Sequence, residues 1–186
     1  MSTRTRPTTG FTLVEVSLIV AVCGVVLAVA IPAFVRAMRV SKVTEAQEEL
    51  TRLYEHAARY YATPQPVDGK KQLRCLPAAA GPTPEVTSTV PRVVDFAAAD
   101  TPGSMTWRAL DYSPQGPVRF RYALIPAAAG CGRPGAPLAP DAPLLTLRAE
   151  ADLDGDGTFS RFERTARDRG GELVLDELLS VTDRVE

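Results

Sequence analysis

The stretch Thr5–Phe34, TRPTTGFTLVEVSLIVAVCGVVLAVAIPAF, decides the fold, because it places a long apolar run directly after a short polar segment. From Val16 to Val35 there are 20 residues without a formal charge. As a helix they would rise about 30 Å, the thickness of the hydrocarbon core of a bilayer. A secretory signal peptide would have an apolar region of only about 7 to 15 residues, followed by a polar mature start. Here the helical pattern continues past Val35, so we expect residues 16–35 to span a membrane.

A single carboxylate, Glu15, stands at the head of this apolar run. An ionised carboxylate at the centre of a bilayer costs roughly 2.5 to 3.5 kcal/mol on insertion scales, and less near an interface. Glu15 should therefore lie shallow in the membrane or have a cationic partner, yet no Lys or Arg lies within one or two helical turns of it. Cleavage of the chain nearby would supply one, because hydrolysis creates a new N-terminal ammonium group. Gly10 is the obvious place for that cut.

The residues around this point form a specific motif, Gly10-Phe11-Thr12-Leu13-Val14-Glu15, followed by an uninterrupted apolar span. The motif resembles the processing site of type IV pilins and of the related type II secretion pseudopilins. The resemblance implies that a prepilin peptidase removes a leader of residues 1–10 by cutting between Gly10 and Phe11 on the cytoplasmic face. It also implies that the Phe11 amine is then N-methylated. In the assembled filament, Glu15 would pair with the Phe11 amine of a neighbouring subunit.

The leader departs from the family pattern at one position. It contains two arginines, but Thr9 precedes Gly10 where a Lys or Arg is more usual, so we expect slower processing. The positive-inside rule does not orient the span, because the leader's charge is balanced from the far side by Arg36, Arg39 and Lys42. The expected orientation therefore follows from the cleavage signature alone.

Gly24 and Pro32 are expected to weaken the helix within the span. Pro32 cannot donate a hydrogen bond to the carbonyl of Ala28, and its ring crowds that turn, so a kink or a local stretch is expected. Their placement also resembles that in pilins, whose helix is similarly interrupted and can partly melt in the filament. The alternative is a tolerated membrane proline with no role.

After the span the helical period persists on one apolar face. Apolar residues recur at steps of three and four, at Val43, Ala46, Leu50, Leu53, Ala57 and Tyr60 or Tyr61. Pro64 and Pro66 end the pattern, which predicts one helix from about Phe11 to Ala62, about 75 Å long at 1.5 Å per residue. Its first half is apolar all round, and its second half is amphipathic and needs a partner surface.

The remainder of the chain, residues 63–186, is expected to form a β-rich head. Short strand-like runs occur at residues 105–113, 118–125, 144–151 and 172–181. The second of these runs alternates cleanly, with one face made of Val118, Phe120, Tyr122 and Leu124. The prediction is an α+β fold, pilin-like, in which the amphipathic half of the long N-terminal helix packs on a small antiparallel sheet. Trp107 is expected to anchor the core of this sheet.

The three cysteines divide by location. Cys23 lies in the span, where a free thiol behaves as a small apolar residue. Cys75 and Cys131 would face an oxidising compartment and are predicted to form a disulfide bond. Two cysteines without a histidine are a poor metal site.

A second motif, DLDGDGTFSRFE, follows the EF-hand ligand pattern. Its predicted calcium ligands are Asp152, Asp154, Asp156, Thr158, Ser160 and Glu163. Gly157, in sixth place, would allow the sharp turn of the loop. The segment before the motif reads as a strand, so we expect an EF-hand-like loop between sheet elements and not an EF-hand domain. An Asp-Gly-rich turn that binds nothing is the alternative.

These observations favour a structural role over catalysis. The net charge of −1 and the lack of a basic cluster argue against nucleic-acid binding. No nucleophile–base pair, phosphate loop or zinc spacing appears, and the lone His56 is expected to be a surface or packing residue. The expected function is a pilin or minor pilin that enters the inner membrane with its head in the periplasm and joins a type IV pilus with other copies or related pilins. Two alternatives are a type II secretion pseudopilin and a membrane-anchored calcium-binding module that does not polymerise.

Overall fold

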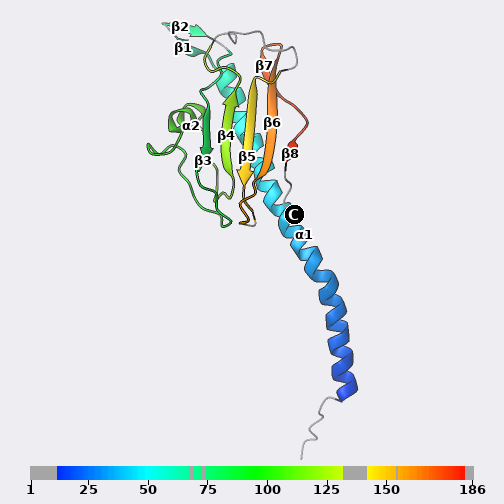
Figure 1. Cartoon of the computed structure of the whole chain (residues 1–186). Coiled ribbons are helices and arrows are strands. Elements are labelled where there is room, and N and C mark those ends of the chain that lie inside the picture. The colour runs from blue at the N-terminus through cyan, green and yellow to red at the C-terminus, as the bar shows by residue number, and fades with distance from the viewer. Residues whose placement is uncertain (1–11, 68, 73, 132–141, 154, 183–186) are drawn as a thin grey trace, which may run out of the picture. The chain divides into compact units, whose positions relative to one another are not determined.

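The computed structural model describes residues 12–67, 69–72, 74–131, 142–153 and 155–182. The fold is α+β, with a long N-terminal helix followed by a small antiparallel sheet, as predicted (Figure 1). In chain order the elements are α1 (Leu13–Ala62), β1 (Gln65–Val67), β2 (Lys70–Gln72), β3 (Ala80–Thr83), α2 (Ser104–Leu110), β4 (Arg121–Pro126), β5 (Leu145–Ala151), β6 (Ser160–Arg169), β7 (Glu172–Leu175) and β8 (Ser180–Thr182). The chain divides into two compact units, residues 1–42 and residues 43–186.

In the first unit, α1 presents one segment that is long and apolar enough to cross a membrane. This segment, Leu13–Phe34, has 22 residues, and none of it is buried within the chain. Such a surface is compatible with a membrane anchor, because an exposed apolar stripe of this length would be unfavourable in water. The helix is continuous through Gly24 and Pro32, so neither residue ends it in the single chain. The predicted weakening at these two positions in a filament stays a prediction.

In the second unit, the end of α1 supplies one wall of the core. The predicted apolar face is buried at Ala46, Leu50, Leu53, Ala57 and Tyr61. Of the two alternatives, Tyr61 is fully in the core and Tyr60 packs against it while partly exposed. Thr63 and two prolines follow the helix, which ends at Ala62 as predicted. The second half of the helix is amphipathic because one of its faces is buried in the core while its other faces are more exposed. The first half has no such buried face and is apolar all round.

The main sheet is antiparallel, in the order β3-β4-β5-β6-β7, and β8 pairs with β6 as well. The alternation predicted for residues 118–125 is confirmed, because the core contains the side chains of Val118, Phe120, Tyr122 and Leu124. The strands predicted at residues 144–151 and 172–181 correspond to β5 and to β7 with β8. The sheet and the amphipathic half of α1 therefore enclose a single core.

The strand predicted at residues 105–113 is wrong, because these residues begin with the short helix α2. A strand would bury every second residue, but Thr106, Trp107 and Leu110 are buried while Met105 is 84% exposed. Gly103 starts the helix with a positive φ of 75°, which favours glycine, and its carbonyl accepts the first hydrogen bonds of the turn. Helical spacing and a glycine start thus outweigh the strand propensity of the aromatic residues.

Trp107 anchors the core, as predicted, although it does so from α2. Its side chain is fully buried, and its ring lies 5.3 Å from the ring of Phe96. The indole Nε1–H donates to the hydroxyl of Thr83 at 3.0 Å and to the carbonyl of Pro102 at 3.2 Å. The polar end of the indole is therefore satisfied inside the core, which a buried tryptophan requires.

Cys75 and Cys131 form the predicted disulfide bond, which closes a loop of 56 residues in sequence. Next to it, Leu76 and Gly130 exchange two backbone hydrogen bonds of 2.9 and 2.8 Å. Replacing both cysteines with serine is expected to lower the free energy of unfolding by about 4 kcal/mol, because the open chain regains loop entropy. Chemical denaturation of the purified head in its oxidised and reduced forms measures this difference. Equal midpoints for the two forms would contradict the prediction.

Candidate functional site

The first candidate site is the start of α1, where Glu15 is held by Thr12. The Glu15 Oε2 atom accepts hydrogen bonds from the backbone N–H and from the hydroxyl of Thr12, both at 2.8 Å. The backbone N–H of Glu15 donates in return to Thr12 Oγ1 at 3.3 Å. This reciprocal arrangement is a capping box, which satisfies backbone donors that a helix start leaves without partners. The carboxylate therefore has partners within its own chain.

Thr12 is thus a hydrogen-bond partner of Glu15 within the single chain, which the sequence analysis did not predict. A cation was the only kind of partner expected for this carboxylate, and Thr12 is not one. The signal was nevertheless present, because Thr and Glu three residues apart at a helix start are the usual pattern of a capping box. Gly10 and Phe11 lie outside the described residues, so cleavage, N-methylation and the pairing of Glu15 across subunits stay predictions.

The second candidate site is the loop between β5 and β6, which contains the EF-hand-like motif. Asp152 turns its carboxylate onto the loop backbone, accepting from the N–H groups of Gly155 at 2.7 Å and Gly157 at 3.0 Å. Asp156 accepts from the N–H of Thr158 at 2.6 Å. Asp154 lies outside the described residues. The motif joins two strands, as the sequence analysis expected, and its described carboxylates hold the turn in shape.

The last two predicted ligands lie on β6 and not in the loop. Ser160 is buried opposite Ala151, and Glu163 stands across from Arg148 of β5 in the strand register. The Arg148 Nε atom lies 2.5 Å from Glu163 Oε1, so the glutamate is engaged in an ion pair. Among the described residues, no group of three or more acidic, His or Cys side chains is gathered in a way that could hold a metal ion. Calcium binding through Glu163 would require this ion pair to open.

Calcium binding to the loop stays a prediction with a direct test. For a dissociation constant of about 10⁻⁴ to 10⁻³ M, 10 mM Ca²⁺ is expected to stabilise the head by about 1.4 to 2.7 kcal/mol. Denaturation of the head with and without Ca²⁺ measures the gain. The variant Asp152→Asn should abolish it, and Mg²⁺ at the same concentration serves as the control ion. A gain that is equal for both ions would show a general ionic effect.

Beside this loop, a cluster of charges covers the outer face of the sheet around Glu150. The Glu150 carboxylate is only 5% exposed and lies 2.8 Å from Arg121 Nη2 and 2.7 Å from Arg161 Nε. Burial alone would raise the pKa of Glu150, but the hydrogen bonds from Arg161 and Arg121 outweigh it and hold the pKa below its usual value. The buried carboxylate and its arginines therefore have a structural role, because removing one partner would leave an uncompensated charge in a buried position.

This cluster predicts a loss of stability in acid. Because the folded-state pKa of Glu150 is lower than its unfolded value of about 4.5, its contribution is complete above that pH and is lost as the pH falls through the folded-state pKa. The variant Glu150→Gln is expected to lower stability at pH 7 and to flatten the decline below pH ~4.5. Thermal unfolding between pH 7 and pH 3 measures both effects. The exposed Glu172→Gln on β7 is the matched control, and a profile that Glu150→Gln leaves unchanged would refute the assignment.

His56 packs between the two helices of the second unit. Its Nδ1 atom lies 2.9 Å from the carbonyl oxygen of Leu110, and its ring makes an edge contact with the ring of Tyr112 at 5.7 Å. Tyr112 in turn donates its hydroxyl hydrogen to Glu49 at 3.0 Å. These contacts fix the end of α2 against α1, so of the two predicted alternatives, a surface residue or a packing residue, His56 is a packing residue.

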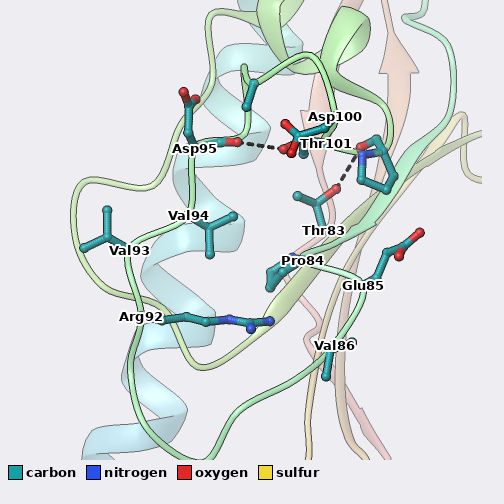
Figure 2. Close-up of a pocket in the computed structure, with 12 residues that line it drawn as sticks. Thr83, Pro84, Glu85, Val86, Arg92, Val93, Val94, Asp95, Asp100 and Thr101 are labelled. Carbon is teal, nitrogen blue, oxygen red and sulfur yellow. Dashed lines mark hydrogen bonds between the residues drawn. The ribbon is translucent and has the colours of Figure 1, made fainter.

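A pocket that the sequence did not predict opens between the end of β3 and the loop that leads to α2 (Figure 2). Its volume is about 480 Å³, and its lining includes the carboxylates of Glu85, Asp95 and Asp100 and the guanidinium of Arg92. In Figure 2, Asp95 and Asp100 lie toward one end of the pocket and Arg92 toward the other. The local sequence is rich in proline and valine, which indicates a loop but gives no signal of a pocket.

Comparison of the chain with protein-family models, with curated proteins and with solved structures finds no match. Any inference about function therefore rests on the N-terminal motif and on the structure of the chain itself.

Proposed function

We propose that this chain is a structural subunit, a pilin or minor pilin, of a type IV pilus filament. The observation that carries the proposal is the motif Gly10–Glu15, which stands directly before an exposed apolar helix. In this proposal the precursor is held in the inner membrane with its head in the periplasm. A prepilin peptidase removes residues 1–10, and the mature chain joins a filament of other copies or related pilins.

The layout of the head supports a structural role over catalysis. Its amphipathic helix, antiparallel sheet and disulfide bond are compatible with a pilin-like subunit. Glu150 and Trp107, two buried groups with polar partners, are occupied in holding the sheet and the core together. The proposed role is therefore structural and includes no enzymatic activity.

A type II secretion pseudopilin is the second candidate function. The observation in its favour is the Asp-rich loop between β5 and β6, since a metal in a C-terminal loop is also found in major pseudopilins. A calcium-binding module that keeps its anchor and never polymerises is the third. The genes that neighbour this one would separate the first two, by belonging to a pilus operon or to a secretion operon.

Mass spectrometry of the chain from its native envelope tests the proposal. The expected mature polypeptide begins at an N-methylated Phe11, and part of it is recovered in the sheared extracellular or polymeric fraction. A mature chain that begins elsewhere would refute the proposed processing. Recovery of the chain only as a monomer in the envelope would favour the module that does not polymerise.

A further inference from the structure

The β1–β2 hairpin stands apart from the main sheet. Among the residues that the structure describes, the two strands pair only with each other, in the register Gln65↔Gln72 to Val67↔Lys70, and form a separate two-stranded sheet. Figure 1 shows this hairpin beyond the end of the main sheet. A two-stranded hairpin by itself is marginally stable in water. An additional surface against which it packs would therefore stabilise it.

The hairpin also presents positive charge without a partner. Lys70 and Lys71 are both exposed, and neither side chain forms an ion pair or a hydrogen bond with another residue that the structure describes. In the antiparallel register these two lysines stand opposite Val67 and Pro66. As consecutive residues of a strand, Lys70 and Lys71 point to opposite faces of the short hairpin. Each of the two ammonium groups favours a negatively charged partner surface.

The pocket between β3 and α2 has the opposite charge. Its three carboxylates, Glu85, Asp95 and Asp100, against one guanidinium, Arg92, give a net charge of −2. The three acidic side chains are exposed, and none forms an ion pair with a described residue, although Asp95 Oδ1 accepts the N–H of Ala97 at 2.8 Å. Within one chain, the two lysines and these carboxylates form no ion pair.

The rim of the same pocket is apolar and exposed. Val86 and Val93, which line it, are 68% and 82% exposed, and Val90 in the same loop is 66% exposed. Exposed apolar groups gathered on one loop indicate an interaction surface. A lysine side chain fits such a surface, because its alkyl stem packs against apolar groups while its ammonium group stays with the carboxylates.

We infer that the β1–β2 hairpin of one copy, through Lys70 and Lys71, docks at the pocket of Glu85, Asp95 and Asp100 on a second copy. The two surfaces are different parts of the chain, so the contact is heterologous. Each copy can offer its hairpin to one neighbour and its pocket to another, so the contact can repeat from copy to copy. Such a contact builds open filaments unless its rotation closes a ring. The inference rests on the proposed function, because it names the parts of neighbouring subunits that meet.

Cysteine cross-linking between two forms of the full-length chain tests this contact in membranes. One form contains Lys71→Cys and the other Asp100→Cys, and both contain Cys23→Ser so that the span offers no thiol. Co-expression is expected to give a disulfide-linked dimer that neither form gives alone. The matched control replaces Asp100→Cys with Glu172→Cys on β7, which lies at the opposite edge of the sheet from β3.

Charge reversal in the same cross-linking pair tests the electrostatic part. Adding Lys70→Glu to the first form is expected to reduce the dimer about two- to fivefold, as for the loss of one exposed ion pair. Adding Asp95→Lys to the second form should restore it. Peptide mapping of the Cys75–Cys131 disulfide in each form shows that the head remains folded.

The outcomes separate this inference from the proposed function. Equal dimer with the Glu172→Cys control, or no dimer from folded chains present at equal levels, overturns the contact. The N-terminus of the same samples is read by mass spectrometry. If the chain begins at Phe11 but gives no dimer, the proposed contact is wrong and the proposed processing is supported. If chains with an uncut leader give a specific dimer, the contact is supported and the proposed processing is wrong.

Discussion

Replacing Gly10 with aspartate is expected to leave the whole population of the chain at its precursor mass. The resemblance of residues 10–15 to a prepilin processing site implies that the peptidase cuts after this glycine. A glycine has no Cβ, so its backbone can approach another protein more closely than that of any other residue. A charged side chain at this position would block that approach. Intact-mass measurement of membrane extracts distinguishes the full chain from one that has lost residues 1–10.

The position before Gly10 supplies a control for this experiment. Thr9→Lys introduces the residue type that is more usual in the family, so this variant should be cut at least as fast as the natural chain. A change of local charge alone would then not account for the effect of Gly10→Asp. Recovery of the Gly10→Asp chain at the mature mass would remove the basis of the proposed function.

Much of the fold follows from periodicity in the sequence. The end of α1 at Ala62 was predictable because prolines follow it closely, and the buried face of its second half was predictable from steps of three and four. The inward face of residues 118–125 was predictable from strict alternation. The pairing of Cys75 with Cys131 followed from there being only two cysteines outside the span. These features depend on local pattern or on counting, and both are readable from one chain.

The parts that sequence analysis missed depend on contacts between distant residues or on short elements. The ion pair of Arg148 with Glu163 exists because the strand register places the two opposite each other, and the EF-hand spacing alone gave Glu163 a different role. The short β1 and β2 strands have too few residues to show alternation. α2 was mistaken for a strand because seven residues are hardly two helical turns. The ion pair thus depends on a contact outside the local pattern, whereas the short elements have too few residues for a pattern to appear.

The substitution Glu15→Gln is expected to separate two roles of this residue, capping α1 and pairing with a neighbouring subunit. Glutamine also completes a capping box with Thr12, so the start of the helix should be retained. The negative charge is lost, however, and with it the predicted pair with the Phe11 amine of the next subunit. A hydrogen bond between charged groups contributes about 1.5 to 3 kcal/mol, so filament yield should fall about 10- to 100-fold while leader removal continues. Quantification of sheared filaments and of mature chain in the membrane measures the two effects.

The matched variant Thr12→Val removes the hydroxyl that bonds Glu15 but keeps the charge and nearly the same side-chain shape. Its cost should be limited to about 1 kcal/mol of helix capping, so filaments should form at close to the normal yield. If instead Glu15→Gln assembles normally and Thr12→Val does not, the glutamate acts through the capping box of its own chain. The pairing with a neighbouring amine would then be unnecessary, and the physical reason for a carboxylate at the head of this span would lie in the capping box that the structure shows.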